Sequence, residues 1–364
     1  MFEITGAAME GIKANDIIFQ QPQSTFARVF EQLANKQDLE EDAALECFRA
    51  MFSGRMSPAC IGTFLMGLKT KGETSLELYC GVRAALEEAV SVPSVAGAHM
   101  DIVGTGGDRM SSFNCSTATA LTLAAMGYSV TKHGNRSVSS IAGSADILEA
   151  MGFPLDTPPE NLLEELERSN FVFLFAPNYH PAFKRIVQVR KEIGAHTIFN
   201  VMGPLINPVR PTHQLLGVAD KKYLMLLGEA LAMSGIERGV VVHGAGGYDE
   251  VSPCGITDAV WVRDGWMKRG QIDPSTVGIP QHSPEELKVR GLEDAMDVFQ
   301  QVLAGKGRAA VLDMVVLNTA VALMLFEEAS TFPKAVKTAK DAVFSGIAEK
   351  KFLASCKDGG AVHA

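Results

Sequence analysis

Short apolar segments alternate with helical patterns over most of the chain, and this alternation limits the fold more than any other feature. After about residue 98 the apolar runs are MDIV, YSVTK, FVFLF, GVVVHG and DAVWV, with helical patterns between them. Such alternation is typical of an α/β sheet that carries helices on its faces. We therefore predict a large α/β domain built on a central mixed sheet.

The first quarter of the chain has helical patterns and little strand character. Apolar residues recur at three-to-four spacing in FARVFEQLA, EDAALECFRAMFSG, SPACIGTFLMGLKTKG and SLELYCGVRAALEEAV, and Gly54 and Gly72 are stop signals. The segment SVPSVAGA at residues 91–98 has the composition of a hinge. We predict a small α-helical domain at residues 1–92, hinge-linked to an α/β domain at 93–364. Whether part of about residues 185–212 packs with the helical domain is left open by the sequence.

Composition excludes several classes of partner. The 364 residues are 47% hydrophobic, which is enough for one large or two moderate domains. The formal net charge is −9, and no run of basic residues makes a positive stripe. Nucleic acid and anionic membrane reward a concentrated positive surface, so neither is an expected partner. A small anionic substrate remains open.

The cysteines and the chain's apolar segments indicate a cytoplasmic protein. Six cysteines lie far apart with no CxxC pair, so neither a zinc site nor a disulfide framework is expected. The N-terminal residues lack the pattern of a secretory signal. The longest apolar segment, AAVLDMVVLNTAVALMLF, contains Asp313 and Asn318 and is interpreted as a buried helix rather than a membrane span.

Three polar loops follow apolar runs. GTGGD follows DIV, KHGNRSVSS follows YSVT, and GAGGYDE follows VVVH. Ligands of α/β sheets bind outside the carboxyl ends of the strands. The common placement predicts one shared site.

The first loop has the composition of a phosphate site. Gly104, Gly106 and Gly107 would expose backbone amides, and the helix pattern that begins near Asn114 would add free N–H donors with a partial positive charge. A phosphate or pyrophosphate suits such a helix start. The alternative is a tight turn followed by an ordinary helix cap.

The other two loops add charge. Lys132 and Arg136 can pair with phosphate oxygens, and Asp249 and Glu250 can hold Mg²⁺, which prefers oxygen ligands. The helix pattern that starts at Ser144 would add a second helix start to the phosphate site. Each loop alone is also compatible with a solvated turn.

Arg190 occupies an inward position. It lies at helical spacing from Phe183, Ile186 and Val187, so we expect it on their apolar face. An inward arginine needs an acidic partner, which is either an internal carboxylate or the carboxylate of a substrate. No histidine stands in a recognisable catalytic arrangement.

Together, the motifs indicate a protein family more specifically than any single motif does. GTGGD, NCST, KHGNRSVSS…GSADILEAMG, FLFAPNYHPAFKRIVQVRKEIG, TIFNVMGPLINP and YDE occur in the order seen in anthranilate phosphoribosyltransferases, and the resemblance covers nearly the whole chain. That family is similar in fold to the pyrimidine nucleoside phosphorylases and is usually a homodimer through its helical domain. The resemblance implies transfer of the phosphoribosyl group of 5-phosphoribosyl 1-pyrophosphate (PRPP) to the amine of anthranilate, in tryptophan biosynthesis.

The resemblance also implies a set of site residues. PRPP would lie along Gly104, Gly107, Asp108, Ser112, Asn114, Cys115, Ser116, Thr117, Lys132, His133, Gly134, Asn135, Arg136, Ser137, Val138, Ser139, Ser140 and Ser144. Asn135 and Arg190 would hold anthranilate, with Arg190 facing its carboxylate. Ser116, Asp249 and Glu250 would bind Mg²⁺. No residue is expected to act as a general acid or base, and Lys132 and Arg190 would act by position and charge.

The chain departs from the family pattern at a few positions. Arg109 stands where a small residue is usual, Ile141 and Ala142 stand where Lys-Ser is common, and His196 replaces a frequent arginine. The alternative functions are a pyrimidine nucleoside phosphorylase, which Asn135, Arg190 and the acidic pair disfavour, and a relative that takes another acceptor or binds nucleic acid.

Overall fold

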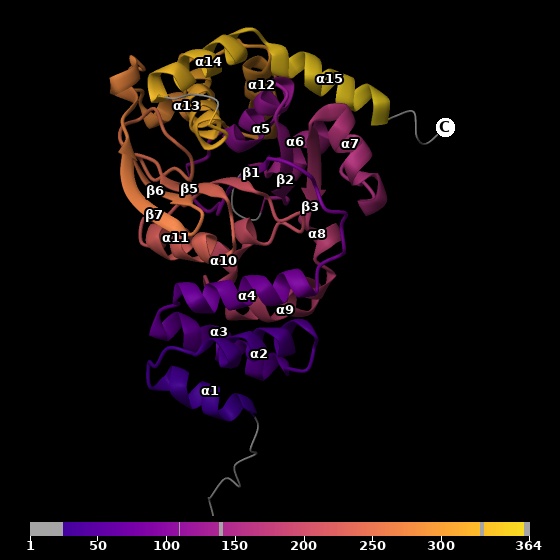
Figure 1. The fold of residues 1–364 in the computed structure, drawn as a ribbon, viewed down its shortest axis with the longest axis vertical. Helices are drawn as coiled ribbons and strands as arrows, with labels where there is room; N and C mark the ends of the chain where they lie inside the picture. The colour runs from indigo at the N-terminus through magenta and orange to yellow at the C-terminus, as the bar shows by residue number, and fades with distance from the viewer. Residues whose placement is uncertain (1–24, 109, 138–140, 328–330, 360–364) are drawn as a thin grey trace, which may run out of the picture.

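The N-terminal helices lie together at one end of the molecule (Figure 1). The computed structural model describes residues 25–108, 110–137, 141–327 and 331–359. Its first helices are α1 (Thr25–Ala34), α2 (Glu41–Phe52), α3 (Pro58–Lys71) and α4 (Ser75–Glu87). The Ser57 side chain accepts a hydrogen bond at the start of α3, and Thr74 and Glu77 form a capping box that begins α4. The predicted helical domain is confirmed.

In the part of the chain that the structure describes, seven strands form one sheet in the order β3-β2-β1-β4-β5-β6-β7. The strands are β1 (His99–Gly104), β2 (Ser129–Gly134), β3 (Phe171–Phe175), β4 (His213–Gly217), β5 (Arg238–His243), β6 (Thr257–Arg263) and β7 (Trp266–Ile272). The five strands from β3 to β5 in this order are parallel, whereas β6 and β7 add to the edge in antiparallel fashion. The predicted mixed sheet is confirmed.

Helices cover both faces of this sheet (Figure 1). Val240 and Val242 of β5 pack into the core beneath α5, α12, α13 and α14, whereas Val241 packs on the opposite side with α4 and α11. A strand covered on both faces is apolar throughout, which explains the continuous VVV run. The other helices are α5 (Cys115–Ala125), α6 (Ser144–Ala150), α7 (Leu162–Ser169), α8 (Ala176–Tyr179), α9 (Lys184–Ile193), α10 (Phe199–Met202), α11 (Tyr223–Met233), α12 (Leu292–Leu303), α13 (Ala309–Leu325), α14 (Phe332–Phe344) and α15 (Ile347–Gly359).

Helices α9 and α10 pack against the N-terminal helices rather than against the far face of the sheet. Ile186, Phe199 and Met202 share one buried cluster with α2, α3 and α4, and α9 contacts α3 and α2 while α10 contacts α4. The expectation that Val187 shares the apolar face of α9 is wrong, because Val187 is 42% exposed. The buried side of α9 instead passes through Ile186 and Val189.

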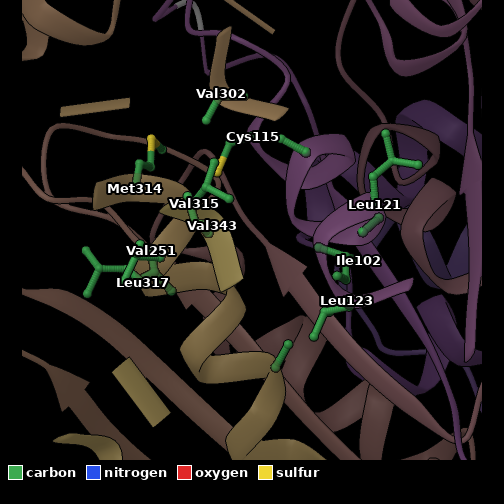
Figure 2. Close-up of a cluster of buried hydrophobic side chains, with 14 of the residues drawn as sticks. Ile102, Cys115, Leu121, Leu123, Val251, Val302, Met314, Val315, Leu317 and Val343 are labelled. Atoms are coloured by element: carbon green, nitrogen blue, oxygen red, sulfur yellow. The ribbon is translucent and has the colours of Figure 1, made fainter. Parts of the chain in front are cut away.

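Helix α13 is the central helix of the larger core, as its apolar sequence predicts. Figure 2 shows Met314, Val315 and Leu317 of this helix among buried side chains that include Val251 and Cys115. Among the described residues, no helix has the length and apolar character needed to cross a membrane.

Candidate functional site

The three predicted loops meet at the carboxyl ends of β1, β2 and β5. The Gly106 N–H donates to Asp249 Oδ2 at 2.7 Å, which joins the first loop to the third. Asn114 Nδ2, at the start of α5, donates to the carbonyl oxygen of Ala142 at 3.1 Å, which joins the start of α5 to the segment that follows the second loop. The prediction that these loops share one edge of the sheet is confirmed.

Close approach and backbone conformation explain the glycines of the first loop. Gly106 and Gly107 have φ angles of +66° and +77°, which side chains disfavour. Gly104 has no such angle, but a Cβ there would overlap the Asp249 carboxylate. The glycines therefore bring the backbone of this loop against an acidic side chain.

Three carboxylates form an acidic cluster, defined here as Asp108, Asp249 and Glu250. One oxygen from each lies within 4.8 Å of the other two. Burial and the neighbouring Asp249 raise the pKa of Asp108 to about 6, and burial also raises the pKa values of Asp249 and Glu250. Within the described part of the chain, buried Glu250 Oε2 has no hydrogen-bond partner. The structure thus adds Asp108 to the acidic pair that the sequence singled out, and this donor set fits a hard divalent cation.

Lys132 lies buried beside this cluster. Its Nζ donates to the carbonyl oxygen of Ile102 and to Ser116 Oγ, the latter at 3.2 Å. Burial lowers the pKa of Lys132, while Asp101 and Glu250 oppose that shift. Lys132 therefore links the start of α5 with the acidic residues.

Beneath Lys132 lies a polar pair that the sequence analysis missed. Asn207 Nδ2 donates to Asp101 Oδ2 at 2.9 Å and to the Thr131 carbonyl oxygen at 2.7 Å, and the His133 N–H donates to Asp101 Oδ1. Burial raises the pKa of Asp101 to about 6, and Lys132 opposes the shift. An aspartate within an apolar strand and an asparagine in GPLINP were the signals that could have revealed this pair.

Arg136, predicted to contact phosphate, is engaged within the protein. Its guanidinium pairs with Glu149 at 2.6 Å and Asp146 at 3.2 Å, and it lies 5.5 Å from the centroid of the Phe175 ring. These ion pairs neutralise much of the charge that the sequence analysis assigned to a substrate.

Asp146 also holds the second loop through hydrogen bonds. Asp146 Oδ2 accepts hydrogen bonds from the backbone N–H groups of Ser137 and Gly143, both at 2.8 Å. This carboxylate occupies the start of α6, so the predicted second helix start is not free for an anion. Ser144 Oγ donates to the Asn135 carbonyl oxygen at 3.4 Å, at the end of β2 beside Gly134. Val138, Ser139 and Ser140, like Arg109, lie outside the described residues.

Other predicted residues are buried in the interior of the protein. Cys115 and Thr117 are fully buried, and burial raises the pKa of the Cys115 thiol, which fits a small core residue. His133 packs against His180 with 5.3 Å between ring centroids, and burial lowers their pKa values to about 3 and 4. Neither imidazole suits a general base at neutral pH.

Asn114 and Ser112, both predicted to line the PRPP site, lie between the first loop and α5. Asn114 stands at the N-cap position of α5, but its side chain makes no capping hydrogen bond. Ser112 forms an antiparallel bridge with Lys288, and the Val289 N–H donates to the Ser111 carbonyl oxygen at 2.8 Å. A distant segment of the chain therefore fixes the conformation of this loop.

Arg190 stands apart from the three loops on α9. Its guanidinium lies 5.2 Å from the centroid of the Phe199 ring, and burial lowers its pKa. Among the described residues, it makes no ion pair with an acidic side chain. The internal acidic partner that the sequence analysis left open is not found in this part of the structure.

Two family models match the chain, and together they define the class of protein. A helical bundle domain of a glycosyl transferase family matches residues 27–89, and the α/β domain of a glycosyl transferase family matches residues 96–349. The fold is therefore that of a two-domain glycosyl transferase.

Individual relatives narrow this class. The anthranilate phosphoribosyltransferase of Oleidesulfovibrio alaskensis is 47% identical over 324 residues, which cover 89% of this chain and 98% of the relative. The crystal structure of the Thermus thermophilus enzyme of that name superposes with a TM-score of 0.84 at 36% identity, over 90% of this chain and 98% of the other. The Saccharomyces cerevisiae enzyme, in complex with PRPP and Mg, shares the fold at a TM-score of 0.83 and 24% identity, over 92% and 99% of the two chains. The present chain belongs to the anthranilate phosphoribosyltransferase family.

Proposed function

We propose that this protein transfers the phosphoribosyl group of PRPP to the amine of anthranilate, with release of pyrophosphate, in tryptophan biosynthesis. The observation that carries the proposal is the acidic cluster, which lies against a glycine loop and a buried lysine at one edge of the sheet. This arrangement suits a polyanion that binds together with a divalent cation.

The phosphates of PRPP would lie over the first loop and the start of α5. Gly107 projects no side chain into the loop, and the Asn114 side chain leaves the first turn of α5 uncapped. Helix starts of this kind stabilise phosphate oxygens. Lys132 would add a positive charge, and the hydrogen bond from its Nζ to Ser116 Oγ keeps this charge beside the start of α5.

Mg²⁺ would be held by Ser116 and the acidic cluster. The unpartnered Glu250 Oε2 supports this assignment, because a buried carboxylate oxygen without a hydrogen bond is costly unless a cation approaches it. The yeast relative of the same fold has been solved with PRPP and Mg. When bound, the metal supplies positive charge that stabilises the departing pyrophosphate.

Anthranilate would be oriented by Arg190 and Asn135. The Arg190 guanidinium is half-buried and has no acidic partner among the residues that the structure describes, and such a group is suited to a carboxylate, with which it forms charge-assisted hydrogen bonds. The aromatic amine then attacks the anomeric carbon as pyrophosphate departs, through a transition state that resembles an oxocarbenium ion. Position and charge suffice for this step, which agrees with the neutral His133 and His180.

Several expectations stay predictions. They are a homodimer formed through α1 to α4, hinge closure between the two domains, the cytoplasmic location, and the absence of nucleic-acid and membrane partners.

Product analysis tests the proposed reaction. Incubation with PRPP, anthranilate and Mg²⁺ should give phosphoribosylanthranilate and pyrophosphate in equal amounts, measured by mass spectrometry and a pyrophosphate assay. Cleavage of thymidine or uridine that requires inorganic phosphate but no Mg²⁺ would instead identify a nucleoside phosphorylase. A product formed only from another amine would show that anthranilate is not the acceptor.

A further inference from the structure

A buried asparagine, Asn318, lies among the mostly apolar side chains of α13. Asn318 is 1% exposed and lies deep in the core, where an amide costs free energy unless its polar atoms are hydrogen-bonded. The neighbouring core residues of this helix, such as Leu317 and Val321, are apolar. A polar side chain at this depth therefore calls for a specific role.

Two hydrogen bonds of Asn318 go to one residue, Val251, and a further one joins its Nδ2 to the Met314 carbonyl oxygen of the same helix at 2.8 Å. Its Oδ1 accepts from the Val251 N–H at 3.0 Å, and its Nδ2 donates to the Val251 carbonyl oxygen at 2.8 Å. The side-chain amide thus pairs with both backbone groups of Val251, as a neighbouring strand would. Val251 directly follows Glu250, so this clamp acts on the segment that carries two acids of the cluster.

Asn318 also reaches the start of α5. Its Nδ2 lies 3.5 Å from Cys115 Sγ, and Cys115 precedes Ser116. Figure 2 shows Val251 and Cys115 near the apolar residues Met314, Val315 and Leu317 of α13. On its other side, the acidic segment is confined by β4, where a Cβ at Gly217 would overlap the Asp249 carbonyl oxygen. The segment is therefore held between a strand end and one helix side chain.

We propose that Asn318 is a positioning residue for the metal site: by clamping Val251, it keeps Asp249 and Glu250 directed towards Asp108 and the start of α5. The assignment rests on the proposed function only in that it takes the acidic cluster as the metal site. It does not depend on which amine is the acceptor. Removal of a group that supports metal ligands typically weakens metal affinity about 10- to 100-fold.

Binding of Mn²⁺, followed by electron paramagnetic resonance on the full chain, tests the proposal without an activity assay. Asn318→Leu removes both bonds to Val251 at similar volume, and Asn318→Ser is a milder variant that cannot bridge both backbone groups. Thr319→Val is the matched control, because buried Thr319 Oγ1 has no hydrogen-bond partner among the described residues. Hydrogen exchange at residues 249–252 reports the clamp directly.

We expect Asn318→Leu to raise the Mn²⁺ dissociation constant about 10- to 100-fold and to speed exchange at residues 249–252, with a smaller effect in Asn318→Ser. Thr319→Val should match the wild type in both measurements. Asn318 variants that lose thermal stability yet bind Mn²⁺ like the wild type would make Asn318 purely structural and overturn the proposal. If the wild type binds no Mn²⁺, the proposal fails together with the metal site. A wild type that binds Mn²⁺ but makes no phosphoribosylanthranilate refutes only the proposed acceptor.

Discussion

The acidic cluster should destabilise the metal-free protein, and Asp108→Asn should therefore stabilise it. The substitution removes one negative charge at nearly constant shape. Asp108 Oδ1 accepts a hydrogen bond from the Met110 N–H at 3.2 Å, and an amide oxygen can accept the same bond. The change in the free energy of unfolding thus reports mainly the cost of a buried charge.

The charge repulsion and the pKa shift give similar magnitudes for this gain. Unit charges at the 4.8 Å limit of the cluster repel each other by about 3.5 kcal/mol at an effective dielectric constant of about 20. A pKa raised from 3.8 to about 6 corresponds to about 3 kcal/mol, at about 1.4 kcal/mol per unit. Burial is the larger cause of that shift and Asp249 the second. Both causes vanish with the charge, so the two figures are not added.

The pH dependence of the gain has a definite sign. The folded state holds the Asp108 proton more tightly than the unfolded state does, so this group lowers stability as pH rises. The penalty is absent below the unfolded pKa of 3.8, grows between 3.8 and about 6, and is complete above about 6. Asp108→Asn should accordingly gain most at pH 8 and much less at pH 5.

Urea unfolding of EDTA-treated protein measures the effect. We expect Asp108→Asn to be more stable than the wild type at pH 8 by up to about 3 kcal/mol, and to lose the stabilisation that Mn²⁺ gives the wild type. Asp297→Asn, at an exposed acid on α12, is the control and should change little. If metal-free Asp108→Asn is less stable than the wild type at pH 8, the electrostatic reasoning is refuted.

Three further substitution experiments address other parts of the site. Arg190→Ala should raise the KM for anthranilate about 10- to 100-fold, as expected for lost charge-assisted hydrogen bonds, and leave the KM for PRPP unchanged; equal losses for both substrates would make Arg190 structural. Gly217→Ala places a Cβ on the backbone of the acidic cluster and should cost about 1–3 kcal/mol of stability and weaken Mn²⁺ binding, whereas Gly62→Ala on α3, which has open space, should do neither. Because burial lowers the pKa values of His133 and His180 to about 3 and 4, kcat/KM should show no ionisation of these two histidines between pH 6 and 8. A step near pH 6.5 that disappears in His180→Gln would contradict the neutral pair.

The sequence predicted those elements whose residues carry a clear periodic or apolar pattern. The amphipathic N-terminal helices and the apolar strands β1, β3 and β5 belong to this group. Strand β4 escaped prediction because His213 and Gln214 interrupt its apolar character, although all of β4 is buried. Strand β7 escaped because it is an exposed edge strand with a mixed polar sequence, and pairing with β6 rather than burial forms it.

The candidate site was predictable where one loop holds its residues and not where side chains meet across the fold. The three loops and the acidic pair follow from motifs. The third acid, Asp108, joins the pair only through the approach of the first loop to Asp249. Likewise, the ion pairs that engage Arg136 come from α6, and the support of Lys132 by Asp101 and Asn207 spans more than 100 residues of chain.

The decrease of anthranilate fluorescence shows whether this protein joins anthranilate to the phosphoribosyl group of PRPP. When purified protein is mixed with PRPP and anthranilate, the anthranilate fluorescence should decrease in the presence of Mg²⁺, and EDTA should stop the decrease. Asp249→Asn should slow it strongly, whereas Asp297→Asn should not. Folded wild-type protein that leaves the fluorescence unchanged with PRPP and Mg²⁺ would contradict the assignment of anthranilate as the acceptor.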